Sequence, residues 1–231
     1  MKLIKLVKKH LLLILFAIMI TTVSIINRQS FIKTLPTLIS LIVQVLLVAA
    51  DRKAFMVGGL NSILYGISYT LDGVYFSAIY AFLISFPVQI YSFFNWKKNS
   101  TNNKVQFKVL GKVKLPITIA VILAVWAGVY FGLSRFFANA TLPIVDTLIF
   151  TLGVVCTFLS AFRYVDSQYV SLINSMISLI MWIMITVNNP ASFNYIIISV
   201  YNTYRVAQAT VSWTRQYRSD KNELRNTQPA E

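Results

Sequence analysis

The chain contains very few of the residues that carry acid-base or metal chemistry. Its 231 residues include one histidine (His10), one cysteine (Cys156) and seven Asp and Glu together. A single cysteine excludes an intramolecular disulfide, and no His/Cys set has the spacing of metal ligands. The sequence also lacks a Gly-rich phosphate-binding loop and a Ser-His-Asp candidate. We therefore predict that the protein is not an enzyme and binds neither a cofactor nor a metal.

Charged residues are scarce as well, at 12% of the chain, whereas 57% of the residues are hydrophobic. An average soluble domain is about 25% charged. A bilayer core needs about 20 apolar residues per spanning helix. The sequence offers eight such stretches, which predicts an all-α membrane protein. The predicted spans are residues 11–26, 34–50, 56–71, 74–96, 115–136, 142–162, 169–187 and 193–213.

Basic residues are the one abundant charged type and give a net charge of +14. With eight spans, seventeen of the 21 Lys and Arg fall on the side that holds both termini. Arg28, Lys33 and Arg135 fall on the other side, and Arg205 lies within the last span. This asymmetry predicts cytoplasmic termini in a plasma-membrane protein. The basic charge therefore orients the protein and meets anionic lipid, and it does not indicate a nucleic-acid surface.

The first predicted span allows a second interpretation. It follows four lysines, so it also fits the basic start and apolar centre of a signal peptide. The segment after it, INRQSFIK, has no small-residue cleavage site, which favours a spanning helix.

Short motifs recur on both sides of a polar, basic loop at residues 97–114. The motif TLPT at 34–37 is matched by TLPI at 141–144, and each begins a span. Further along, LNSIL at 60–64 is matched by INSMI at 173–177. These matches predict that a three-helix unit was duplicated.

A unit of three spans ends on the side opposite its start, so one linker helix restores the side and makes the two copies parallel. Parallel repeats are a known transporter plan, with the substrate near the midplane at the repeat interface. The predicted domains are an N-terminal basic segment with an extra helix (1–33), a first three-helix bundle (34–96), a basic cytoplasmic loop with a linker helix (97–140), a second three-helix bundle (141–213) and a cytoplasmic tail (214–231).

Polar and aromatic side chains recur at helical spacing in the second and third spans of each unit, so they share one face of each helix. Buried amides are costly unless they are paired or wetted. Two interpretations remain open: the amides join helices, at about 0.6 kcal/mol each, or they line a polar cavity between the units. We favour the cavity because the stripes occupy the same two helices of each unit. The residues predicted to bind a substrate are Asn61, Tyr65, Gln89, Asn174, Ser178, Trp182, Asn202 and Tyr204.

No Asp or Glu lies deep within a predicted span, and Asp146 is only one turn from the outer end of its helix. Proton and sodium relays normally need a buried carboxylate or histidine. We therefore predict no coupling to an ion gradient. Arg205 is the one charge well inside a span, roughly 12 Å from the cytoplasmic end of that span. Its side chain either snorkels to the interface, or it acts as a gate or binds an anion.

Residues 59–98, GLNSILYGISYTLDGVYFSAIYAFLISFPVQIYSFFNWKK, closely resemble the PnuC family of vitamin-precursor transporters. This family is known for the uptake of nicotinamide riboside in bacteria. The resemblance is carried by the GLNSILYG start, by the Asp-Gly turn before Tyr75, and by Pro87, Gln89 and Trp96. In the second half, Asn174 matches the amide of the family's sixth core helix. Val170 departs from the family, which usually has an aromatic residue there.

The resemblance implies a core of three, one and three helices, similar to the SWEET sugar transporters, with a substrate between the bundles. It also implies facilitated diffusion made one-way by cytosolic phosphorylation of the product, and homotrimers in some members. Gln89 and Asn174 are then expected to hydrogen-bond the ribose or the amide of the substrate, whereas Asn61, with Tyr65, is either a binding or a structural position. The ring of nicotinamide riboside is positively charged, so aromatic faces suit it. The aromatic candidates are Tyr65, Trp96, Trp182 and Tyr204.

Three hypotheses follow. The first is a passive carrier of nicotinamide riboside or a related vitamin precursor. The second is a carrier of the same fold for thiamine, riboflavin or a (deoxy)nucleoside, because Val170 removes an expected stacking surface. The third is a membrane assembly subunit that transports nothing.

Overall fold

The computed structural model describes residues 2–101, 104–111, 114–133, 136 and 140–227, and helices account for most of them. The elements are α1 (Lys2–Ile26), α2 (Phe31–Val48), α3 (Lys53–Leu71), α4 (Tyr75–Ile79), the π-helix η1 (Tyr80–Ser85), α5 (Phe86–Lys98), β1 (Ser100–Thr101), β2 (Lys104–Val105), α6 (Lys114–Leu133), α7 (Pro143–Ala161), α8 (Asp166–Asn188), the 3-10 turn η3 (Pro190–Ser192) and α9 (Phe193–Thr227).

The predicted all-α fold is confirmed, and each of the eight predicted spans coincides with a helix. The span predicted at 74–96 consists of α4, η1 and α5, which follow one another without a break. Within the described part of the chain, four helical segments are long and apolar enough to cross a membrane: α2, Tyr75–Lys98, α7 and α8. Leu11–Ile26 and Pro116–Gly132 are shorter apolar helices.

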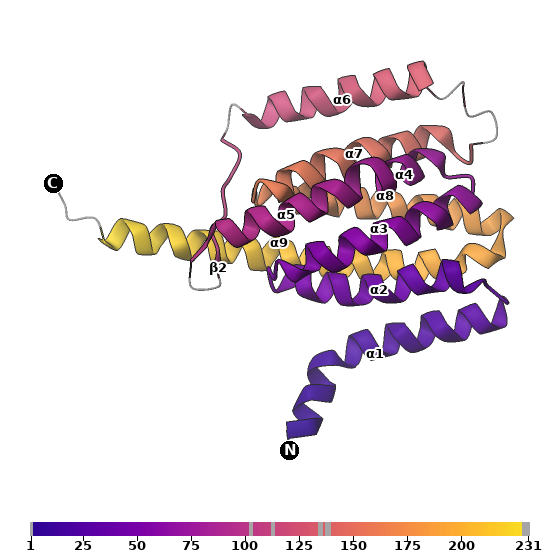
Figure 1. The fold of residues 1–231 in the computed structure, drawn as a ribbon, viewed down its shortest axis with the longest axis horizontal. Coiled ribbons are helices and arrows are strands. Elements are labelled where there is room, and N and C mark those ends of the chain that lie inside the picture. Colours follow the sequence, from indigo (N-terminus) through magenta and orange to yellow (C-terminus); the bar gives the residue numbers. More distant parts are fainter. Residues whose placement is uncertain (1, 102–103, 112–113, 134–135, 137–139, 228–231) are drawn as a thin grey trace.

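Six helices form a closed ring. Around it, α2 packs against α3, α3 against α5, α5 against α7, α7 against α8, α8 against α9, and α9 against α2. Helices α1 and α6 lie outside the ring, on opposite sides of it in Figure 1: α1 contacts α2 and α9, and α6 contacts α7. The ring therefore contains three helices from each predicted unit.

Contacts between the helix ends fix the direction of each helix. At one end, Lys33 pairs with Asp72, the Thr141 N–H donates to the Gly73 carbonyl at 3.0 Å, and the Asn27 side chain donates to the Pro190 carbonyl at 3.4 Å. Helices α2, α4, α7 and α9 all begin at this end, so the two sets of three helices run parallel (Figure 1).

The opposite end carries many basic side chains, and we call it the basic end. Helices α2, α5, α7 and the membrane part of α9 reach it, and α9 continues beyond it to Thr227, where the sequence predicted only a tail. The basic residues of this end include Arg52, Lys53, Lys97, Lys98, Lys104, Lys108, Arg163 and Arg215. Lys112 and Arg135, which also entered the charge prediction, lie outside the described residues.

The basic loop at 97–114 was predicted as a polar connection, and part of it packs onto the helix bundle. Val105 and Phe107 are buried there against Trp96 and Trp213. Trp96 is fully buried and its Nε1–H donates to the Ser160 carbonyl at 2.9 Å. Trp96 therefore anchors the basic end, and in this structure its ring packs against Phe55, Phe107 and Trp213.

Candidate substrate site

Asn61 lies on α3 and is only 3% exposed. Its Nδ2 donates to the Pro36 carbonyl and to Ser40 Oγ, both at 3.0 Å, which ties α3 to α2. Ser40 Oγ in turn donates to the Tyr65 hydroxyl at 2.9 Å. The Oδ1 of Asn61 is buried and accepts no hydrogen bond. The Asn61 NH₂ group therefore joins α3 to α2, and the Asn61 oxygen remains an unused acceptor.

Gln89 occupies the neighbouring interface between α5 and α3. Its Nε2 donates to Ser62 Oγ at 3.0 Å and to Ser85 Oγ at 2.7 Å, and these two hydroxyls lie 2.8 Å apart. Gly58 makes room for the Gln89 amide, because a Cβ at Gly58 would overlap Gln89 Oε1. In this conformation, both donors of Gln89 are used within the protein.

Four aromatic rings form a continuous stack from α3 through α8 to α9. Tyr65 stacks on Tyr69 with centroids 5.2 Å apart, and Tyr69 stacks on Trp182 at 5.7 Å. Trp182 stacks on Tyr195 at 4.0 Å with an interplanar angle of 24°. The stack bridges the two predicted units through the Tyr69 and Trp182 contact. Tyr69 and Tyr195 were not predicted from the sequence, although Tyr69 lies four residues after Tyr65 and thus on the same helix face.

The Tyr69 and Trp182 contact sets the relative height of α3 and α8. Each residue lies 16 positions after the first residue of its helix, 53 to 69 and 166 to 182. Asn61 and Asn174 each lie eight positions after that first residue. At 1.5 Å per residue both amides are therefore about 12 Å along their helices, in the middle of a hydrocarbon core about 30 Å thick.

Asn174 is half-buried, and its Oδ1 is buried without a hydrogen-bond partner. Ser178 follows one turn later, between Asn174 and the level of Trp182. Among the described elements, α3 and α8 make little direct contact with each other. The two helices thus contribute polar side chains at the same depth without closing tightly on each other, as expected of a site between two units.

Comparison with known proteins identifies the family. The family model described as "Nicotinamide mononucleotide transporter" matches residues 30–215. The chain belongs to this transporter family. A solved structure, "Crystal structure of the Vitamin B3 transporter PnuC", is 16% identical, with 90% of each chain covered and a TM-score of 0.76. The search of curated proteins found no match.

Membership in the nicotinamide mononucleotide transporter family confirms the resemblance to PnuC, and it makes the protein a membrane-embedded transporter and not an enzyme. The solved PnuC structure has the same fold. The matched residues begin at 30, so α1 lies outside the family match. The ring helices α2 to α5 and α7 to α9 lie within it, apart from the last residues of α9.

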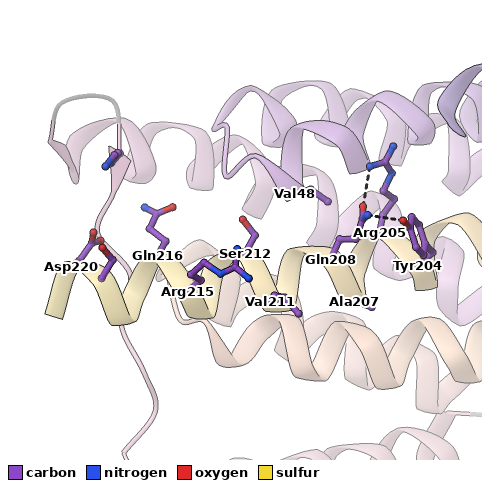
Figure 2. A pocket seen from close by; sticks show the side chains of 12 residues that line it. Val48, Tyr204, Arg205, Ala207, Gln208, Val211, Ser212, Arg215, Gln216 and Asp220 are labelled. Atoms are coloured by element: carbon purple, nitrogen blue, oxygen red, sulfur yellow. Dashed lines mark hydrogen bonds between the residues drawn. The ribbon is translucent and has the colours of Figure 1, made fainter. Parts of the chain in front are cut away.

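The remaining two predicted residues of the transporter lie on α9 and face different surroundings. Asn202 is half-buried, and its Oδ1 is another buried acceptor without a partner. Tyr204 is 50% exposed, and its hydroxyl accepts a hydrogen bond from Gln208 Nε2 at 2.7 Å. Tyr204 lines a groove on the outside of α9 in which no other predicted site residue takes part (Figure 2). The structure therefore places Tyr204 away from the other predicted site residues.

Asp146 lies at the end of the helix bundle opposite the basic end, where it connects α7 to the start of α4. It is fully buried on α7 and accepts from the backbone N–H of Phe76 at 2.9 Å and of Ser77 at 3.1 Å. The Ser77 hydroxyl donates to the same carboxylate at 2.5 Å. Asp146 thus caps the start of α4 and joins the two units, a role that sequence reasoning missed because it depends on a partner 69 to 70 residues away.

Proposed function

We propose that this protein carries nicotinamide riboside, or a closely related vitamin B3 precursor, across the plasma membrane by facilitated diffusion. The substrate binds between two parallel three-helix units, residues 34–96 and 141–213, and residues 97–140 supply the basic loop and linker helix. Family membership supports transport, and the substrates named for the family and for the solved structure support this substrate class.

One observation carries the assignment of the site: among the residues predicted to bind a substrate, three have a buried amide oxygen without a hydrogen-bond partner, namely Asn61, Asn174 and Asn202. An unsatisfied buried polar group costs about 1–3 kcal/mol. A substrate that donates hydrogen bonds to these oxygens removes that cost. Ribose hydroxyls and a carboxamide NH₂ are such donors, so we assign these three amides to polar recognition, assisted by Ser178.

The positive ring of nicotinamide riboside fits the aromatic part of the site. A cation over an aromatic face gains about 0.5–2 kcal/mol, more when it is desolvated. Tyr65 provides a face about one turn from the amide layer and Tyr69 a face about two turns from it. Trp182 with Tyr195 covers the site on the side away from the basic end. We therefore assign Tyr65 and Trp182 to the ring, and we add Tyr69 to the set.

The charge of the site distinguishes the riboside from the mononucleotide. The faces of α3 and α8 that carry Asn61 and Asn174 hold no Lys or Arg at this depth among the described residues. Arg205 of α9, three residues after Asn202, lines the groove on the outside of that helix. A phosphate at this depth would need a cationic partner, because burying an unpaired charge is very costly. The site therefore favours the riboside, which lacks the phosphate.

The proposed mechanism is passive. Asp146 caps α4, and Asp72 pairs with Lys33, both at the end opposite the basic end, so neither carboxylate lies at the depth of the amides. We propose that phosphorylation of the product in the cytosol makes uptake one-way. We also propose that both termini are cytoplasmic, since the basic end holds most of the positive charge, and that the protein assembles as a homotrimer.

Counterflow in proteoliposomes tests the function. Vesicles loaded with unlabelled nicotinamide riboside should accumulate labelled riboside without any imposed ion gradient. A competition assay separates a riboside carrier from a carrier of thiamine, riboflavin or a deoxynucleoside. Each compound is added outside the vesicles in excess, and the cargo of the protein should suppress the accumulation of labelled riboside most. An absence of counterflow with every ligand, in protein that is folded by size-exclusion chromatography, would support a non-transporting assembly subunit instead.

A further inference from the structure

A groove runs along the outside of α9 where this helix leaves the membrane at the basic end (Figure 2). Its volume is about 940 Å³, and its lining comes from α9, from Val48 at the end of α2 and from Lys104 on β2. The lining extends from Tyr204 to Asp220, which at 1.5 Å per residue is roughly 24 Å along α9. The groove therefore extends from within the membrane to the aqueous boundary.

The lining changes character along the groove. Ala207, Val211 and Val48 form its apolar part, and Val211 is 58% exposed. Lys104, Arg205 and Arg215 contribute three positive charges against the single carboxylate of Asp220. Arg205 lies at the inner end of the groove and Lys104 and Arg215 lie near its outer end, with Ala207 and Val211 between them. Cationic side chains beside an apolar surface at a membrane boundary match a lipid with an anionic headgroup, because basic pockets between helices on the cytoplasmic side bind such headgroups.

The three cations are available to a ligand. Within the described residues the ion pair is Lys33 with Asp72, and Lys104, Arg205 and Arg215 form none. Arg205 is held in place by its own surroundings: its Nη1 donates to Gln208 Oε1 at 3.0 Å, and its Cζ lies 5.1 Å from the Tyr201 ring centroid. Its Nε is buried and donates to nothing. A positioned guanidinium with an unused donor suits an oxygen-rich ligand.

Helix α1 explains why this part of α9 is open. Further from the basic end, α1 covers the same side of α9, since Asn194 donates to Ser24 Oγ at 2.6 Å and Phe16 packs on Tyr201 with centroids 5.0 Å apart. No residue of 11–26, the part of α1 whose side chains the structure describes, lines the groove. The groove is thus the continuation of a helix-packing seam, and it leaves space for a chain-shaped apolar ligand.

We propose that this groove binds one anionic phospholipid, such as phosphatidylglycerol. Its phosphate lies at Lys104 and Arg215, and its glycerol packs against Val211. Its ester oxygens contact Arg205 and Gln208, and an acyl chain continues inward past Ala207. This site lies outside the proposed substrate site, and it gives Arg205 a role that the transport proposal leaves open.

Native mass spectrometry of the full-length protein in detergent tests the proposal. Phosphatidylglycerol and phosphatidylcholine with the same acyl chains are titrated, and we expect the anionic lipid to bind at least tenfold more tightly. Each basic residue near an anionic headgroup contributes about fivefold in affinity. The double variant R205Q/R215Q should therefore weaken phosphatidylglycerol binding about thirtyfold, whereas the matched control K97Q/K98Q, which removes two exposed charges of the same end, should change it less than twofold.

A second variant tests the shape of the groove without changing its charge. Val211→Trp places an indole in the apolar part from an exposed position and should weaken phosphatidylglycerol binding while leaving the melting temperature unchanged. Equal binding of the two lipids, or equal losses in R205Q/R215Q and K97Q/K98Q, would overturn the proposal. Displacement of the lipid by inorganic phosphate alone would indicate a site for a soluble anion, and a change of oligomer mass in Val211→Trp would indicate that a second copy covers the groove.

Discussion

Replacing Asn174 by Leu separates the two explanations for the amides in the membrane. In the structure, the Asn174 Oδ1 is buried and unpaired, so the empty protein bears a cost of about 1–3 kcal/mol at this atom. Leu has nearly the same size and removes the polar atom. We therefore expect the free protein to keep its melting temperature or to gain a few degrees.

Binding should respond in the opposite direction. A net hydrogen bond to a neutral group contributes about 0.5–1.5 kcal/mol, and leaving a substrate donor unpaired adds to the loss. The affinity for nicotinamide riboside should therefore fall at least tenfold, as about 1.4 kcal/mol corresponds to a factor of ten. Thermal unfolding of purified protein with and without the riboside measures both quantities, and counterflow measures transport.

Asn95→Leu is the matched control for this experiment. Asn95 lies on α5, and its Nδ2 donates to the Ala161 carbonyl at 2.8 Å, so it joins α5 to the end of α7 near the basic end. We expect Asn95→Leu to lower the melting temperature and to leave the affinity unchanged. If Asn174→Leu behaves like Asn95→Leu, with lower stability and intact binding, then Asn174 joins helices and our site is misplaced.

Three further predictions follow from the packing. Gly58→Ala should displace the Gln89 amide from its two serine partners and destabilise the protein by about 1–2 kcal/mol. The control Gly128→Ala, where a Cβ meets open space, should be neutral or slightly stabilising. The melting temperatures of the two variants test this difference. Asp146→Ala leaves three donors without their acceptor and should cost about 3 kcal/mol or more, measured by the same assay; a loss below 1 kcal/mol would contradict the capping role. Trp182→Leu removes two ring contacts of about 0.5–1.5 kcal/mol each and should weaken the riboside more than an uncharged nucleoside in competition counterflow.

The positions of the helices could be predicted from sequence because the hydrophobic stretches are long and the positive charges are segregated. The aromatic stack could be predicted only in part. Tyr65 and Trp182 lie on polar stripes, but Tyr195 is near the start of α9, and its contact with Trp182 depends on how α8 and α9 cross. Sequence spacing contains no information on that crossing.

The π-helix η1 shows a similar limit. Pro87 permits a kink in its helix, since proline lacks an N–H and clashes with the preceding turn. The structure places the irregular backbone at Tyr80–Ser85, directly before α5, and keeps the helix continuous. The π-turn brings Ser85 to 2.8 Å from Ser62, so the distortion also positions the partners of Gln89. A single proline indicates that a helix is irregular, but not which side chains the irregularity brings together.

Comparison of the two units explains why their amides differ. The TLP motifs align Pro36 with Pro143 and Ser40 with Thr147. In the first unit, the Pro36 carbonyl and Ser40 accept both hydrogen bonds of Asn61. In the second unit, the Pro143 carbonyl already accepts from the Thr147 hydroxyl at 2.8 Å. If the units are copies, as the recurring motifs predict, a threonine occupies in the second unit the carbonyl that anchors the amide of the first. Asn174 can then direct its hydrogen-bonding groups toward a substrate.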